Sequence, residues 1–76
     1  MIFDKIKEIL VNQLGVDPET LSEETSLLDD LGADSLDLVE VMMSLESEFG
    51  VTVEDEEITQ IKTIGDIIRL IETKNA

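Results

Sequence analysis

The apolar residues of the chain recur at helical spacing in several segments, a pattern that predicts helices rather than strands. Between residues 2 and 14 they repeat every three or four positions, and Gly15 follows as a natural helix stop. A shorter pattern covers residues 55–61, and a longer one begins at Ile64 directly after a capping sequence. These patterns predict a first, a short third and a last helix.

The segment 35–49 predicts a further helix, with Asp34 and Asp37 in a capping pattern at its start and Gly50 at its end. It carries two apolar stripes. One stripe is expected to face the core and consists of Leu38, Val41, Met42, Leu45 and Phe49. The other consists of Leu36, Val39 and Met43. Periodicity alone allows the second stripe to be core or an exposed docking ridge.

Residues 15–34 predict a long loop rather than a helix. Asp17-Pro18 favours one helical turn, and Ser26 to Asp29 matches a second capping pattern. Apolar residues are expected to pin the loop to the core, namely Val16, Leu21, Leu27, Leu28 and Leu31. The expected fold is therefore all-α, a small antiparallel four-helix bundle with a long first loop and a short third helix. At 76 residues, the chain (1–76) is expected to be a single domain.

Charge narrows the possible partners. Nineteen acidic and five basic residues give a net charge of −14, and no Lys or Arg occurs from Glu8 to Ile61. Such a surface repels nucleic acid and anionic membranes and favours partners with basic patches. No segment has the length of a membrane span, and the N-terminal residues do not resemble a signal peptide. We therefore expect a cytoplasmic protein without nucleic-acid binding or membrane insertion.

The absence of Cys and His excludes several chemistries. Disulfides, thiolate or imidazole metal sites and Ser–His catalysis all need one of these residues. A calcium loop over residues 29–40 also fails, because its third and fifth positions are Leu31 and Ala33 and its sixth is not Gly. No metal site is expected.

Ser35 is the one hydroxyl in a position that suggests chemistry, because a long loop there meets the start of a helix. Backbone N–H groups and the positive end of the helix dipole favour a phosphate at such a place. The simpler reading is that Ser35 only begins the helix. The surrounding residues 31–40, LGADSLDLVE, resemble the Asp-Ser-Leu motif of acyl carrier proteins of type II (dissociated) fatty acid synthesis, and the likeness extends over the whole chain.

The resemblance implies a carrier and not an enzyme. A phosphopantetheinyl transferase would attach 4′-phosphopantetheine from coenzyme A to Ser35, framed by Asp34 and Leu36, and the thiol of that arm would hold acyl groups as thioesters. This would explain how a chain without Cys takes part in thiol chemistry. It also implies a phosphoprotein of lipid metabolism, expected to act as a monomer.

The resemblance further implies two sets of contact residues. Basic docking patches of fatty acid synthase enzymes would meet a partner-docking face formed, besides Leu36, by Asp37, Val39, Glu40, Met43 and Glu46. Acyl chains would enter a pocket lined by Leu45, Val53, Ile58, Ile61 and Ile67. Ile58 is bulkier than the family's usual residue there, so it is expected to narrow the pocket.

Two other functions remain open at this stage. A carrier for polyketide or another specialised acyl pathway would have the same motif. An acidic protein-interaction module without a prosthetic group would explain the charge but not the context of Ser35.

Overall fold

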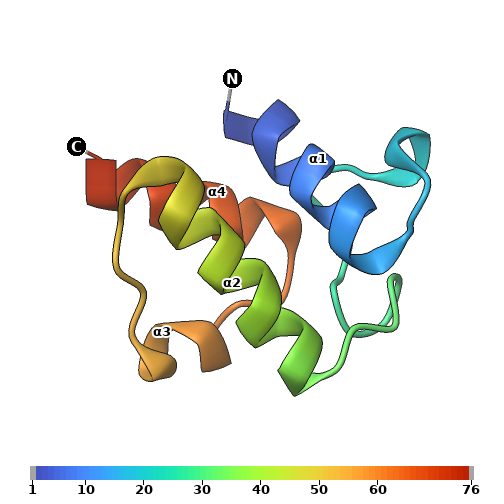
Figure 1. Ribbon diagram of the computed structural model, residues 1–76. Coiled ribbons are helices and arrows are strands. Elements are labelled where there is room, and N and C mark those ends of the chain that lie inside the picture. The colour runs from blue at the N-terminus through green and yellow to red at the C-terminus, as the bar shows by residue number, and fades with distance from the viewer. Residues whose placement is uncertain (1, 76) are drawn as a thin grey trace.

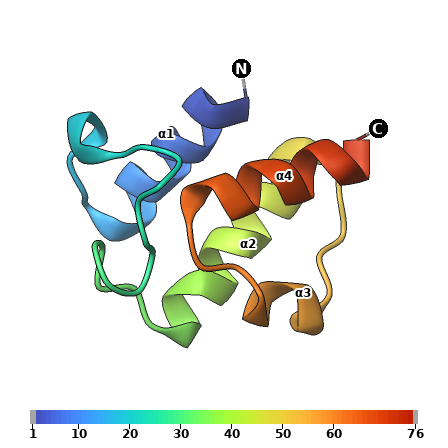
Figure 2. The ribbon, with the colours of Figure 1, turned by 180° about the vertical axis from the view of Figure 1, so that it is seen from behind.

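The computed structural model describes residues 2–75, which form four α-helices and one short helical turn (Figure 1). The helices are α1 (Ile2–Leu14), α2 (Ser35–Phe49), α3 (Asp55–Thr59) and α4 (Ile64–Asn75), and a 3-10 turn spans Pro18–Thr20. Helix α1 contacts both α2 and α4, while α3 contacts α2. Seen from behind, α4 lies in front of α2 (Figure 2). The all-α bundle expected from the sequence is confirmed.

Local signals account for the helix ends. Asp34 Oδ1 accepts the Asp37 N–H at 2.9 Å, and Asp37 Oδ2 accepts the Asp34 N–H at 3.2 Å, which completes the expected capping box of α2. Gly50 ends α2 with φ of +66°, a conformation that costs glycine little. Only α3 differs from expectation, because it ends at Thr59 and not at residue 61.

The core is aliphatic and takes side chains from α1, α2, α4 and the loop before α2. Of the stripe expected inside α2, all members but Phe49 are buried, and Phe49 is half-buried. The fully buried side chains of the core are Ile6, Leu10, Leu27, Val41, Met42, Leu45, Ile64, Ile67 and Ile71. Within residues 2–75 no helix is long and apolar enough to cross a membrane.

The loop before α2 is fastened to the start of α4 by backbone hydrogen bonds. The Leu27 N–H donates to the Lys62 carbonyl at 2.9 Å, and the Ile64 N–H donates to the Thr25 carbonyl at 3.1 Å. The Gly65 N–H donates to a third carbonyl, that of Glu23, at 2.8 Å. A Cβ on Gly65 would lie 3.0 Å from the same oxygen, so this close approach favours glycine. These contacts fix the loop that leads to Ser35.

One loop residue corrects an expectation. Leu28 was expected to anchor the loop in the core, but its side chain is 51% exposed, while Leu27 beside it is fully buried. Leu27 faces inward because its N–H is bonded to Lys62 and its carbonyl accepts the Ala33 N–H at 2.9 Å. The next side chain in this turn therefore points to solvent.

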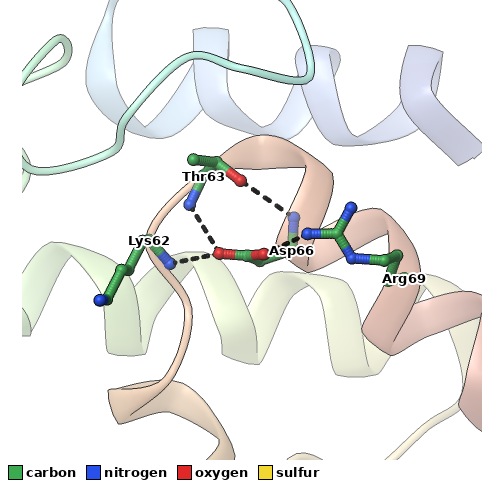
Figure 3. A network of polar contacts seen from close by, with 4 residues as sticks. All are labelled: Lys62, Thr63, Asp66 and Arg69. Carbon is green, nitrogen blue, oxygen red and sulfur yellow. Dashed lines mark hydrogen bonds and ion pairs between the residues drawn. The ribbon is translucent and has the colours of Figure 1, made fainter.

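Asp66 organises the first turn of α4 (Figure 3). Its carboxylate accepts the backbone N–H groups of Lys62 at 2.9 Å and Thr63 at 3.1 Å, and it pairs with the Arg69 guanidinium. The Asp66 N–H in turn donates to the Thr63 hydroxyl at 3.2 Å. Hydrogen bonds from the backbone N–H of Lys62, and then from that of Thr63 and the Arg69 guanidinium, hold the pKa of the Asp66 carboxyl below its ordinary value of 3.8.

This network predicts an acid-sensitive contribution to stability. Because the pKa of Asp66 is lower in the folded chain, the contribution is present above the unfolded value of 3.8 and is lost as the pH falls through the folded value. Asp66→Asn should lower the free energy of unfolding by about 1 kcal/mol at neutral pH, because hydrogen bonds to a charged acceptor are stronger by about this amount than bonds to a neutral one. Urea unfolding of both proteins should show this difference shrinking on acidification below the unfolded value. A difference independent of pH would show that the charge of Asp66 contributes nothing.

Candidate functional site

Ser35 is the first residue of α2 and its side chain is exposed. The capping box of Asp34 and Asp37 fixes the start of the helix on both sides of it. The Ala33 N–H donates to the carbonyl of buried Leu27, so the residue before the cap is also tied to the fixed loop. The structure therefore presents the Ser35 hydroxyl to solvent from a rigid position.

The second apolar stripe of α2 is exposed, which decides between the two readings left open by periodicity. Leu36 is 66% exposed, Val39 39% and Met43 61%. Exposed Leu28 adds a fourth large apolar side chain, from the loop. Sequence reasoning missed Leu28 because it counted the residue as a core anchor, and an adjacent pair of leucines does not tell which one faces inward. Exposed apolar residues grouped in this way are typical of a docking surface.

The acidic residues expected to dock partners are not equivalent. Glu40 is exposed on α2. Asp37 is half-buried and uses one carboxylate oxygen in the capping box. Glu46 is also half-buried, and its Oε2 accepts the Val53 N–H at 2.7 Å, which ties α2 to the segment before α3. Glu40 is thus the docking candidate whose carboxylate is most available to a partner.

The basic residues do little to neutralise this face. The three ion pairs found among residues 2–75 join Lys5 to Glu48 at 2.9 Å, Lys74 to Glu57 at 3.0 Å, and Arg69 to Asp66. None of them involves Asp37 or Glu40. The acidic residues near Ser35 therefore keep their negative potential for an approaching partner.

A pocket of about 340 Å³ opens beside Ser35, between α2 and α3. Ser35 itself forms part of its wall, and the polar groups of Asp55 and Thr59 lie on the α3 side. The rest of the lining is aliphatic and consists of Leu28, Leu38, Val39, Ile58 and Ile61. An elongated, mostly apolar group attached at Ser35 could therefore enter the protein here.

The pocket brings together only part of the expected acyl-binding set. Ile58 and Ile61 line it, with Ile58 half-buried on α3. Leu45, Val53 and Ile67 do not line it but are buried in the core. A ligand would reach these three residues only if the pocket deepened.

Within residues 2–75 no cluster of three or more acidic side chains has the arrangement of a metal site.

Comparison with known proteins places the chain among carriers of a prosthetic group. Residues 4–71 match the family model described as the phosphopantetheine attachment site. The acyl carrier protein of Wolinella succinogenes is 54% identical over 72 residues, covering 95% of both chains. That of Thermotoga maritima is 55% identical over 73 residues, covering 96% of this chain and 90% of the relative.

Solved structures agree with the sequence comparison. A crystal structure of an acyl carrier protein from Thermotoga maritima superposes with a TM-score of 0.85 at 36% identity, covering 97% of this chain and 86% of that one. A putative acyl carrier protein from Mycobacterium tuberculosis gives a TM-score of 0.89 at 29% identity, covering 96% and 97%.

Proposed function

The chain belongs to the acyl carrier protein family, and from this premise we propose that it carries its prosthetic group on Ser35. The protein is a carrier of acyl groups in fatty acid synthesis and not an enzyme, and its cofactor is 4′-phosphopantetheine. That group supplies the thiol that this chain, which has no Cys, lacks. Residues 1–76 would act as a single acyl-carrier domain.

One observation carries the assignment of Ser35. It is an exposed hydroxyl at the start of a helix, and it borders a mostly apolar pocket of about 340 Å³. The phosphate of the group would lie at the positive end of the α2 dipole. The Ser35 oxygen would lose its proton and bond to the phosphorus, while the diphosphate bond of coenzyme A breaks and adenosine 3′,5′-bisphosphate leaves. Asp34, as the N-cap, and exposed Leu36 would frame Ser35 for the phosphopantetheinyl transferase.

A mass measurement tests first whether the chain accepts the group at all. The purified chain is incubated with coenzyme A and a phosphopantetheinyl transferase, and the intact protein is weighed. We expect an increase equal to one phosphopantetheine group. An unchanged mass would contradict the carrier function and favour the acidic interaction module.

We place the acyl chain in the pocket between α2 and α3. Ile58 and Ile61 would contact it first, because they line the pocket, and Leu45, Val53 and Ile67 would be reached by deepening toward the core. The bulk of Ile58 at the wall would narrow the entrance.

The protein acts together with acyl chains and the enzymes of fatty acid synthesis. For the docking face we propose the exposed apolar side chains Leu36, Val39 and Met43 together with Glu40. Asp37 and Glu46 would add charge while their hydrogen bonds hold the chain itself. Basic patches on the enzymes would meet these residues.

A cytoplasmic location of the protein stays a prediction.

Glu40→Lys is expected to slow association with such an enzyme at least about threefold at low ionic strength, because charge complementarity sets the encounter rate. Salt should reduce the difference by screening. Stopped-flow association kinetics at two salt concentrations would measure it. Glu72→Lys is the matched control, since it makes the same charge change at an exposed site of α4. Equal slowing by both variants would mean that net charge matters and the α2 face does not.

A further inference from the structure

Helix α3 is attached to the rest of the fold by few buried groups. It has five residues, and none of them is buried. The buried side chains on either side, Val53 and Ile61, lie outside the helix itself. A helix this short has little stability of its own, so its position depends on the contacts that hold it.

Space remains on both sides of α3. The pocket beside Ser35 lies on its α2 side and is lined there by Asp55, Ile58 and Thr59. A second hollow of about 260 Å³, open to solvent, lies between α3 and α4, where Glu57 and Gln60 face residues of α4. Close packing is what normally holds a helix in place, so a helix with an open hollow on either side has room to shift. A shift toward α4 would enlarge the pocket beside Ser35.

One ion pair spans the α4 side. Lys74, in the last turn of α4, lies with its Nζ 3.0 Å from Glu57 Oε1, and both side chains are half-buried. The same Oε1 accepts the Glu54 N–H at 2.9 Å, so a single oxygen caps α3 and joins it to α4. The Glu54 N–H, with Lys74, holds the pKa of the Glu57 carboxyl below its ordinary value.

We propose that Lys74 is a positioning residue for the pocket beside Ser35. Its ion pair with Glu57 fixes α3 between the two open hollows and thereby sets the width of that pocket. The consequence for acyl chains rests on the proposed function, whereas the restraint on α3 is a property of the unmodified chain.

The test compares two substitutions with the same charge change. Lys74→Gln removes the contact between α3 and α4, and Lys5→Gln removes the pair between Lys5 of α1 and Glu48 of α2. Amide hydrogen exchange, followed by NMR on the unmodified chain, reports opening of α3 through the N–H groups of Ile58 and Ile61. Lys74→Gln should accelerate this exchange about two- to fivefold, the range for one partly exposed ion pair. Lys5→Gln should leave it unchanged.

A purely structural role of Lys74 at the end of α4 would give a different result. Faster exchange confined to the last turn of α4, or equal acceleration by both variants, would overturn the proposal. The pocket gives a second readout, because Leu28 and Val39 line it from outside α3. Their methyl signals should shift in Lys74→Gln and not in Lys5→Gln, and unmoved signals would count against Lys74 as a positioning residue.

Three further variants test the pair itself. Glu57→Gln keeps an oxygen for the Glu54 N–H but removes the charge, so it should reproduce the effect of Lys74→Gln. The double variant should add nothing, whereas additive effects would show that the residues act separately. Lys74→Arg should restore slow exchange. Failure of phosphopantetheine addition would overturn the proposed function without altering these results, so the two failures are distinguishable.

Discussion

Ser35→Ala will keep its unmodified mass after incubation with coenzyme A and a phosphopantetheinyl transferase, whereas the wild-type chain gains one phosphopantetheine group. Loss of attachment should be complete, because the phosphate ester needs the hydroxyl oxygen that alanine lacks. The fold should survive, since the Ser35 side chain is exposed and the cap of α2 depends on Asp34 and Asp37. Intact-protein mass spectrometry and far-ultraviolet circular dichroism would measure both results.

Ser47→Ala is the matched control, because Ser47 is also an exposed serine of α2 but lies near the other end of the helix. It should be modified as fully as the wild type. Addition to Ser35→Ala would move the attachment site to another hydroxyl. Loss of modification in both variants would point to damage of the helix rather than to removal of the acceptor.

Leu27→Ala should lower the free energy of unfolding by about 2–5 kcal/mol, the range for truncating a fully buried leucine. Leu27 is fully buried, and its removal would leave a cavity where the loop meets α4. A domain of this length has a total stability of about 4–11 kcal/mol, so the variant would approach the limit of folding. The melting temperature should fall by at least about 8 °C.

Leu28→Ala controls for the change in composition, because it makes the same substitution one residue along, at a side chain that is 51% exposed. Its stability should stay within about 0.5 kcal/mol of the wild type. Thermal and urea unfolding of both variants would show the contrast. Similar losses for the two leucines would mean that the loop does not distinguish an inner from an outer side chain in solution.

The helices could be predicted because their signals are local. Asp34, Asp37 and Gly50 lie within a few residues of the ends that they determine, and a repeat of three to four residues defines each buried face. The position of Ser35 at a helix start left its role open, and the proposed attachment residue came from the resemblance of residues 31–40 to the motif of acyl carrier proteins. The sequence could not decide whether the stripe of Leu36, Val39 and Met43 was buried, since burial depends on where neighbouring helices pack.

The features that could not be predicted join residues far apart in the chain. The direction of Leu28 depends on a bond between the N–H of Leu27 and the carbonyl of Lys62. Glu46 was expected to contact partners, and nothing in the sequence indicated that it also accepts the Val53 N–H beyond the end of α2. The lining of the pocket likewise combines a loop, α2 and α3, so no pattern within one segment could specify it.

The backbone bonds between the loop and the start of α4 also bear on the order of events during synthesis. Residues 23–27 leave the ribosome well before residues 62–65, with which they pair. Pairings between such distant segments form late, because a long stretch of chain must first be closed. Ser35 is therefore translated early but acquires its fixed surroundings only when the beginning of α4 is available. An enzyme that recognises those surroundings would find its substrate only after most of this sequence has been made.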